Sequence, residues 1–229
     1  MLEGAFIDLS RPLHPGMPVF PEDPEVAFAP AAALEPWRVT RLSLGTHSGT
    51  HIDAASHYVP AGSTIDAYPL ERFVLPARVV PVTAGEDQAI EWPDLAAALP
   101  DALEGAAVLL HTGWDRHWGS PRALRHPFLS AAAAAGLVDR GAGLVGTDAL
   151  NVDATEGGTT HAHAALLGAD VLIVENLIGL EALDPARPYL CAFVPLRLEG
   201  ADGSPVRAFA FAGDAGATLP RRPQGAPLQ

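Results

Sequence analysis

The sequence predicts a single α/β domain built on a mixed sheet. Short apolar runs that suit strands outnumber the segments with helical periodicity, and the two kinds are mixed along the chain. The chain has 229 residues, of which 48% are hydrophobic and 18% charged. This length supports one large core, and the composition is globular. We expect residues 1–218 to form the domain and residues 219–229, LPRRPQGAPLQ, to be a loose tail or to dock on a partner subunit.

Glycine and proline punctuation separates many short elements. Residues 14–30, HPGMPVFPEDPEVAFAP, hold five prolines and are expected to form an ordered, irregular loop. The expected strands are Ala5–Leu9, Trp37–Leu44, Phe73–Val82, Ala107–His111, Gly143–Thr147, Val171–Val174, Leu190–Leu198 and Val206–Phe211. The expected helices are Trp92–Leu99, Phe128–Arg140 and His163–Leu167. The alanine run inside the second helix fits a surface helix with close backbone packing, because alanine is the best helix former.

Charge and composition exclude several classes of function. The net charge of −13 would repel nucleic acid and anionic lipid, and no basic cluster offsets it. No apolar run approaches the roughly 20 residues of a membrane span, and acids stand near the N-terminus where a signal peptide has Lys or Arg. We therefore expect a cytoplasmic protein with no nucleic-acid or membrane partner. The single cysteine, Cys191, lies in an apolar run and is expected to be a buried hydrophobe, so any metal ligands must be His, Asp or Glu.

Three of the nine histidines fall within one segment, HSGTHIDAASH, which contains His47, His51, Asp53 and His57. Imidazole and carboxylate are the usual ligands of divalent metals where no thiolate is offered. Gly49 and Thr50 predict a tight turn that folds His47 towards His51. In an extended segment His51 and Asp53 point to the same side. The segment therefore predicts a metal site, and the alternative is a polar surface turn with scattered histidines.

A second candidate segment lies downstream, in THAHAALLGADVLIVENL. Glu175 ends an apolar strand run, where an acid is poorly placed unless a charged group receives it. A short helix followed by this strand could return Glu175 near His163. Two acids, Asp53 and Glu175, could then bridge two ions, as in hydrolytic two-metal sites. An exposed acid at a strand end is the alternative for Glu175.

The motif HSGTHIDAASHY resembles the signature of the cyclase family, H-x-G-T-H-x-D-x-x-x-H, a family that includes the bacterial kynurenine formamidases. Other segments resemble later family blocks in the same order: VLLHTGWDRHWG, TDALNVD, the His163–Leu177 segment and PLRLEGADGSPVRAFA. The resemblance implies a swivelling β/β/α domain with a mixed sheet, assembled as a homodimer or homotetramer. It also implies zinc or manganese, two ions per subunit. The implied metal ligands are His47, His51, Asp53, His163 and Glu175, with both acids bridging, and the implied catalytic acid/base is His57.

The expected reaction is hydrolysis of a small-molecule amide. Water activated by the cations attacks the carbonyl, and His57 moves the proton to the leaving nitrogen. The resemblance favours an arylformamidase, which converts N-formyl-L-kynurenine and water to L-kynurenine and formate. The chain differs from the formamidases at Ala55, where they have Pro, and at Phe20, where they present a Trp to the substrate ring. Phe20 is expected to bind substrate, or else to be a core aromatic.

Two other functions stay open. One is hydrolysis of isatin or another small cyclic amide or ester, which needs the same metal and the same His57. The other is a non-catalytic metal- or ligand-binding protein, against which the presence of His57 argues. The roles of five further residues are less definite. Trp114 and Trp118 are expected to pack, Asp148 and Asp153 either orient ligand imidazoles or cap turns, and His161 is expected in a solvated loop.

Overall fold

A nine-stranded mixed sheet forms the centre of the computed structural model, which describes residues 4–34 and 36–213. Its strands, from one edge to the other, are β1 (Gly4–Asp8), β13 (Phe209–Gly213), β11 (Tyr189–Ala192), β5 (Val74–Pro81), β7 (Ala107–His111), β9 (Leu144–Thr147), β10 (Leu172–Glu175), β4 (His51–Asp53) and β12 (Gly203–Pro205). This confirms the expected α/β class. The expected tail, residues 219–229, lies outside the described residues.

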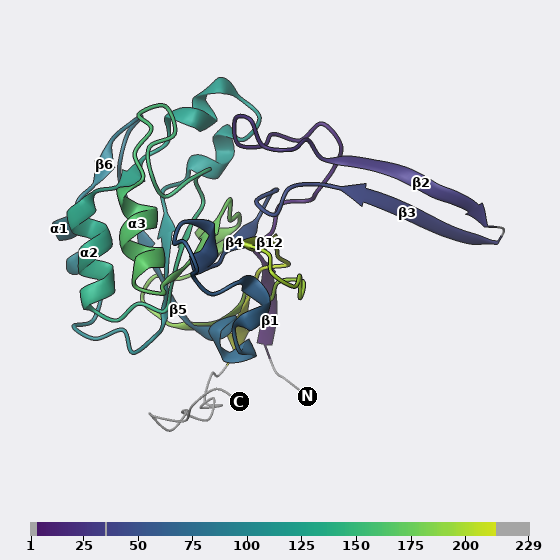
Figure 1. The fold of residues 1–229 in the computed structure, drawn as a ribbon. Coiled ribbons are helices and arrows are strands. Elements are labelled where there is room, and N and C mark those ends of the chain that lie inside the picture. The colour runs from purple at the N-terminus through teal and green to yellow at the C-terminus, as the bar shows by residue number, and fades with distance from the viewer. Residues whose placement is uncertain (1–3, 35, 214–229) are drawn as a thin grey trace.

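The middle four strands, β5, β7, β9 and β10, run parallel, and the outer strands pair antiparallel. Three helices cover one face of the parallel part: α1 (Trp92–Ala96), α2 (Ala131–Asp139) and α3 (His161–Gly168) (Figure 1). Along β7, Val108 and Leu110 face the helices, while Ala107 and Leu109 face a second core. Both faces of the centre are therefore buried, as parallel strands require.

The edge that carries β4 joins distant parts of the chain. β4 lies between β10 and β12 and pairs antiparallel with both, so that His51 lies opposite Glu175 on one side and opposite Pro205 on the other. Gly203 in β12 has to be glycine for close approach, because a Cβ there would lie 2.7 Å from the carbonyl oxygen of Ile52 and 2.9 Å from His47 Cε1. The backbone of this edge therefore fits closely around the first histidine of the HSGTH motif.

Two strands form a separate antiparallel pair that we call the arm: β2 (Ala27–Leu34) and β3 (Trp37–Ser43). Figure 1 shows the arm extending away from the sheet. Every residue of β3 is exposed, including Trp37 at 72% and Leu42 at 58%. A third pair, β6 (Ala89–Ile90) with β8 (Phe128–Leu129), is short and parallel.

Several expected elements differ from the structure. The proline-rich segment was expected to be irregular to residue 30, but β2 begins at Ala27. The strand expected at Leu190–Leu198 ends at Ala192, and beyond it only Pro195 makes an isolated bridge, with Val206. Proline has no N–H for a ladder, so it cannot extend that strand regularly. α1 ends three residues before its expected end, and α2 is shorter than expected at both ends. α3 begins two residues earlier than expected and ends one residue later. Among the described residues, no helix has the length and apolar character needed to cross a membrane.

Candidate active site

The HSGTH motif forms a turn that leads into β4. Gly49 has φ +64°, and a Cβ there would lie 2.6 Å from Leu13 Cδ2, so the turn requires glycine. The rings of His47 and His51 come within 5.0 Å of each other, measured between centroids, as the sequence predicted. His51 and Asp53, two residues apart in an extended strand, lie on the same side, with His51 Nε2 3.4 Å from Asp53 Oδ1.

α3 and β10 supply the other half of the cluster. His163 lies in the first turn of α3, which packs on β10, and Glu175 ends β10 directly opposite His51. His163 Nε2 is 3.8 Å from Glu175 Oε1, and His51 Nε2 is 3.5 Å from Glu175 Oε2. The structure therefore brings together all five residues expected as metal ligands.

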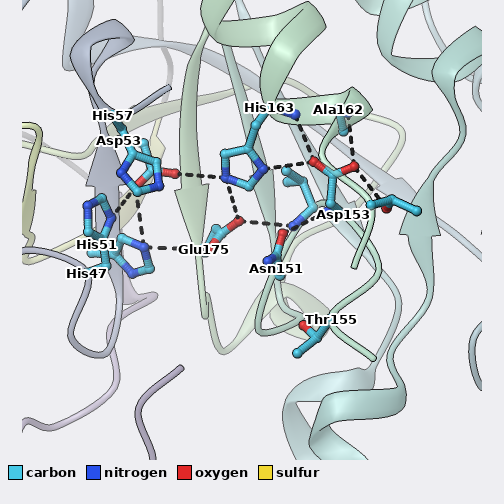
Figure 2. A network of polar contacts seen from close by, with 12 residues as sticks. His47, His51, Asp53, His57, Asn151, Asp153, Thr155, Ala162, His163 and Glu175 are labelled. Carbon is cyan, nitrogen blue, oxygen red and sulfur yellow. Dashed lines mark hydrogen bonds and ion pairs between the residues drawn. The ribbon is translucent and has the colours of Figure 1, made fainter. Parts of the chain in front are cut away.

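Two imidazoles and two carboxylates alternate around a closed ring (Figure 2). His163 Nε2 lies 3.6 Å from Asp53 Oδ2, which completes the circuit His51–Asp53–His163–Glu175. Ligand atoms that share one tetrahedral ion at about 2.0–2.2 Å lie roughly 3.3–3.6 Å apart. Asp53 Oδ2 is also buried with no hydrogen-bond partner among the described residues. Spacing, donor chemistry and this unsatisfied oxygen all fit a divalent cation.

Asp53 belongs to two sets of ligand atoms that lie within 4.8 Å of one another, one with His47 and His51 and one with His57 and His163. Its two oxygens point to different histidines, because Oδ1 contacts His47 Nδ1 at 2.7 Å and Oδ2 faces His163. A carboxylate between two such sets suits a bridging ligand.

Two of the imidazoles expected as metal ligands are held by their second nitrogen. His51 Nδ1 is 2.8 Å from the carbonyl oxygen of Gly49, which leaves Nε2 free towards the acids. His163 Nδ1 is 2.8 Å from Asp153 Oδ2. Such contacts fix the tautomer and orientation of a metal-binding histidine. Asp153 makes contacts of both expected kinds, because it also accepts the N–H groups of Ala162 and His163 at the start of α3.

Asp202 is a member of the cluster that the sequence did not reveal. Its Oδ2 lies 3.2 Å from His47 Nε2 and 3.4 Å from His57 Nδ1. β12 brings it there, and its carbonyl accepts a hydrogen bond from the Ala54 N–H. It stands in the segment EGADGSPV, which was noted as a family block, but no spacing connects it with histidines about 150 residues earlier.

His57 follows β4 in a short 3-10 turn, Ala55–His57, at the edge of the cluster. Its ring centroid is 3.9 Å from that of His47 and 5.7 Å from that of His163. Burial lowers the pKa of His57. The neighbouring His47 and His163 lower it further, and together these effects outweigh Asp53, which raises it. His57 is therefore neutral at pH 7 and able to accept a proton.

The buried ionisable groups of the cluster shift one another's pKa values strongly. Although burial opposes it, Asp53 and Asp202 raise the pKa of His47 to about 9. Burial is likewise outweighed at His163, where Asp153 and Asp53 raise the pKa to about 10. Burial, together with the charge of Asp53, raises the pKa of Glu175 to about 7. Two adjacent buried carboxylates of this kind need positive charge beside them.

A cavity of about 340 Å³ opens above the cluster. His47, His51, His57, His163 and Glu175 form part of its lining. Further walls are supplied by three aromatic residues: Phe20, Tyr58 and Trp118. Phe20, which was expected to bind substrate or to be a core aromatic, thus lies in the wall of the cavity. This volume is within the range of about 300–1,000 Å³ typical of small-molecule sites.

Three other expectations are settled by the structure. Trp118 was expected to pack, but it lines the cavity, with the Arg11 guanidinium 4.2 Å above its ring. Trp114 is buried, as expected. Asp148 accepts hydrogen bonds from the N–H groups of Thr112 and Gly113, so it caps a turn.

The expectation of a solvated loop histidine at His161 was wrong, because this residue begins α3 and its Nε2 contacts the Leu129 carbonyl at 2.7 Å.

Comparisons with known proteins give a consistent result. Residues 7–154 match the family model described as putative cyclase. The kynurenine formamidase of Maricaulis maris (strain MCS10) is 36% identical over 214 residues, which cover 88% of this chain and 95% of that protein. Among solved structures, isatin hydrolase A from Labrenzia aggregata superposes with a TM-score of 0.81 at 26% identity, covering 92% and 94% of the two chains. A protein of Bacillus stearothermophilus described as a predicted metal-dependent hydrolase has a TM-score of 0.76 at 30% identity, with coverage of 90% and 98%.

Proposed function

Because the chain belongs to the cyclase family, we propose that it is a metal-dependent amide hydrolase, and specifically an arylformamidase that converts N-formyl-L-kynurenine and water to L-kynurenine and formate. The ring of His51, Asp53, His163 and Glu175 beneath an aromatic-walled cavity is the observation that carries this proposal. The kynurenine formamidases among its relatives support the choice of substrate.

We propose that His47, His51, Asp53, His163 and Glu175 hold two zinc or manganese ions, with Asp53 and Glu175 between them. The mixture of imidazole and carboxylate suits either metal. When bound, the ions would polarise the substrate carbonyl and lower the pKa of the attacking water. The name of the Bacillus stearothermophilus protein supports metal dependence.

His57 is the proposed acid/base. Asp202 Oδ2 faces its Nδ1 at 3.4 Å, so Nδ1 carries the hydrogen and Nε2 is free to accept a proton. Nε2 takes the proton from the attacking water and then delivers it to the leaving anilide nitrogen. The C–N bond breaks, the amine leaves with the transferred proton, and formate remains. Phe20 and Trp118 offer ring faces to the aryl group.

Hydrolysis of isatin or another small cyclic amide or ester is the alternative, supported by the similarity to isatin hydrolase A. Assays of the purified protein with zinc and with manganese, on N-formylkynurenine, isatin and simple aryl formamides, test the choice. The proposal expects the highest kcat/KM on N-formylkynurenine. A protein that binds metal yet hydrolyses none of these substrates would instead be a non-catalytic binding protein.

We also propose a homodimer or homotetramer in which the arm packs against a second copy. The arm exposes Trp37, Val39 and Leu42, and a hairpin of two strands alone is marginally stable in water. It also carries two arginines, Arg38 and Arg41, while the whole chain has a net charge of −13. A second copy of this acidic chain therefore offers complementary charge to the arm. A cytoplasmic location is proposed as well, since the lone buried Cys191 needs no oxidising compartment.

A further inference from the structure

A tight turn brings one carboxylate to the wall of the active-site cavity. The Asp23 N–H donates to the Phe20 carbonyl at 3.0 Å, which closes a turn over Phe20–Asp23. Both ends of the turn, Phe20 and Asp23, line the cavity together with His57. The aromatic ring proposed to stack on the substrate and the carboxylate are therefore positioned by the same hydrogen bond.

The Asp23 carboxylate has no protein partner. Within residues 4–34 and 36–213 it makes no hydrogen bond and no ion pair. Glu175, the other acid in the cavity lining, differs, because it accepts a hydrogen bond from the Val152 N–H and faces His51 and His163. Asp23 is thus a half-buried carboxylate in the cavity lining without a partner among the described residues.

The described lining of the cavity includes no lysine and no arginine. Its basic side chains are the histidines of the cluster, which we assign to the metal ions and to proton transfer. A cationic group on the substrate would find Asp23. The rings of Phe20 and Tyr58 add to this preference, because ring faces attract cations. Asp23 and the neighbouring aromatic rings of the cavity therefore favour a substrate that carries an ammonium group.

We infer that Asp23 is a specificity residue that binds a primary ammonium group on the side chain of the substrate. This inference rests on the proposed arylformamidase function. The preferred class is an aryl formamide whose ring carries an aliphatic primary amine, as N-formylkynurenine does. Because the described lining offers no lysine or arginine to a carboxylate, N-formylkynuramine, the same molecule without the carboxylate, is expected to be at least as good a substrate.

Three substrates separate the contribution of the ammonium group from that of the carboxylate. They are N-formylkynurenine, which has both groups, N-formylkynuramine, which has only the ammonium group, and formanilide, which has neither. The test variant is Asp23→Asn, which keeps the shape and removes the charge. The matched control is Glu22→Gln, in the same turn, because Glu22 is exposed and does not line the cavity. Both variants change the net charge of the chain by the same amount.

Asp23→Asn should lower kcat/KM for the two ammonium substrates by about fivefold to tenfold, the size expected for a partly exposed charge-assisted hydrogen bond. The loss should appear in KM with kcat nearly unchanged, because the ammonium interaction is the same in ground and transition states. Hydrolysis of formanilide by Asp23→Asn, and of all three substrates by Glu22→Gln, should stay within twofold of the parent.

Equal losses on all three substrates, or no loss on any, would overturn the role of Asp23. So would parental hydrolysis of N-formylkynuramine more than tenfold less efficient than that of N-formylkynurenine, since the carboxylate would then have a binding partner. Failure of the proposed function gives a different result, in which the parental protein hydrolyses none of the three formamides.

Discussion

Asp153 holds His163 twice with one oxygen: Oδ2 accepts the backbone N–H of His163 at 2.9 Å and lies 2.8 Å from its ring Nδ1. The other oxygen accepts from the Ala162 N–H (Figure 2) and from the Thr159 hydroxyl. All acceptor positions of this buried carboxylate are therefore in use. Its position fixes both the start of α3 and the direction in which His163 Nε2 points.

Replacing Asp153 by Asn should weaken metal binding by about 10–100-fold, because a carboxamide cannot hold all four donors and loses the charge that orients His163. Isothermal titration with zinc or manganese measures the change. Asp139→Asn, an exposed aspartate at the end of α2, is the control and should bind as the parent does. An affinity of Asp153→Asn within twofold of the parent would show that this contact does not support the site.

Replacing His57 by Ala should lower kcat by about 10²–10⁴-fold while the metal content stays the same, because His57 is assigned to proton transfer and not to metal binding. Turnover and elemental analysis of the same preparation measure both quantities. His14→Ala, at an exposed histidine outside the cluster, should leave both unchanged. Loss of metal from the His57 variant would instead assign this residue as a ligand.

Removing metal with a chelator should lower Tm by about 5–15 °C, since an ion at 100–1,000 times its Kd stabilises the folded state by roughly 3–4 kcal/mol. Differential scanning calorimetry of the metal-loaded protein measures the shift. Asp53→Ala should contain no metal, and its Tm should not respond to the chelator. A parental Tm that is indifferent to chelation would count against a tight site.

Metal binding should release between two and three protons at pH 7. His47 and His163, with pKa values of about 9 and 10, are protonated at that pH, and each must lose its proton to become a ligand. Glu175, with a pKa of about 7, is about half protonated and contributes the remaining fraction. The apparent affinity should therefore rise with pH between about 6 and 8 and fall on acidification. Titrations in buffers with different ionisation heats count the protons, and heats independent of the buffer would contradict both ligand assignments.

The purified protein should be a dimer or tetramer by light scattering, and Trp37→Lys combined with Val39→Lys should produce a monomer. These changes place charge on the exposed face of the arm that we propose to be buried between copies. Leu70→Lys is the control, because Leu70 is 68% exposed but lies outside the arm. A monomeric parent, or a double variant of unchanged mass, would exclude the arm as the interface.

The sequence predicted the strands at the centre of the sheet well, because parallel strands buried on both faces leave continuous apolar runs. Ala107–His111 was predicted with its observed bounds. β2 was missed because its proline suggested a loop. In the structure Pro30 stands beside a register shift in a two-stranded pair, where its missing N–H is tolerated. β4 has only three residues, too few for any periodicity, although the same-side placement of His51 and Asp53 was predicted.

The candidate site was predictable where its residues are close in sequence or end an element. His47, His51 and Asp53 share one motif, and Glu175 was an acid at the end of an apolar run. Asp202 could not be found this way, because only the pairing of β4 with β12 places it beside His47. Trp118 was misjudged because sequence alone does not tell which side of an aromatic ring faces a cavity.

The placement of β4 has a consequence for synthesis on the ribosome. This strand is made early, but both of its neighbours, β10 and β12, are made far later, since they end at residues 175 and 205. The strand that carries His51 and Asp53 therefore has no neighbouring strand to pair with until most of the polypeptide has emerged. Such distant pairings make folding slow, so the nascent protein should acquire its ion as one of the last events of maturation.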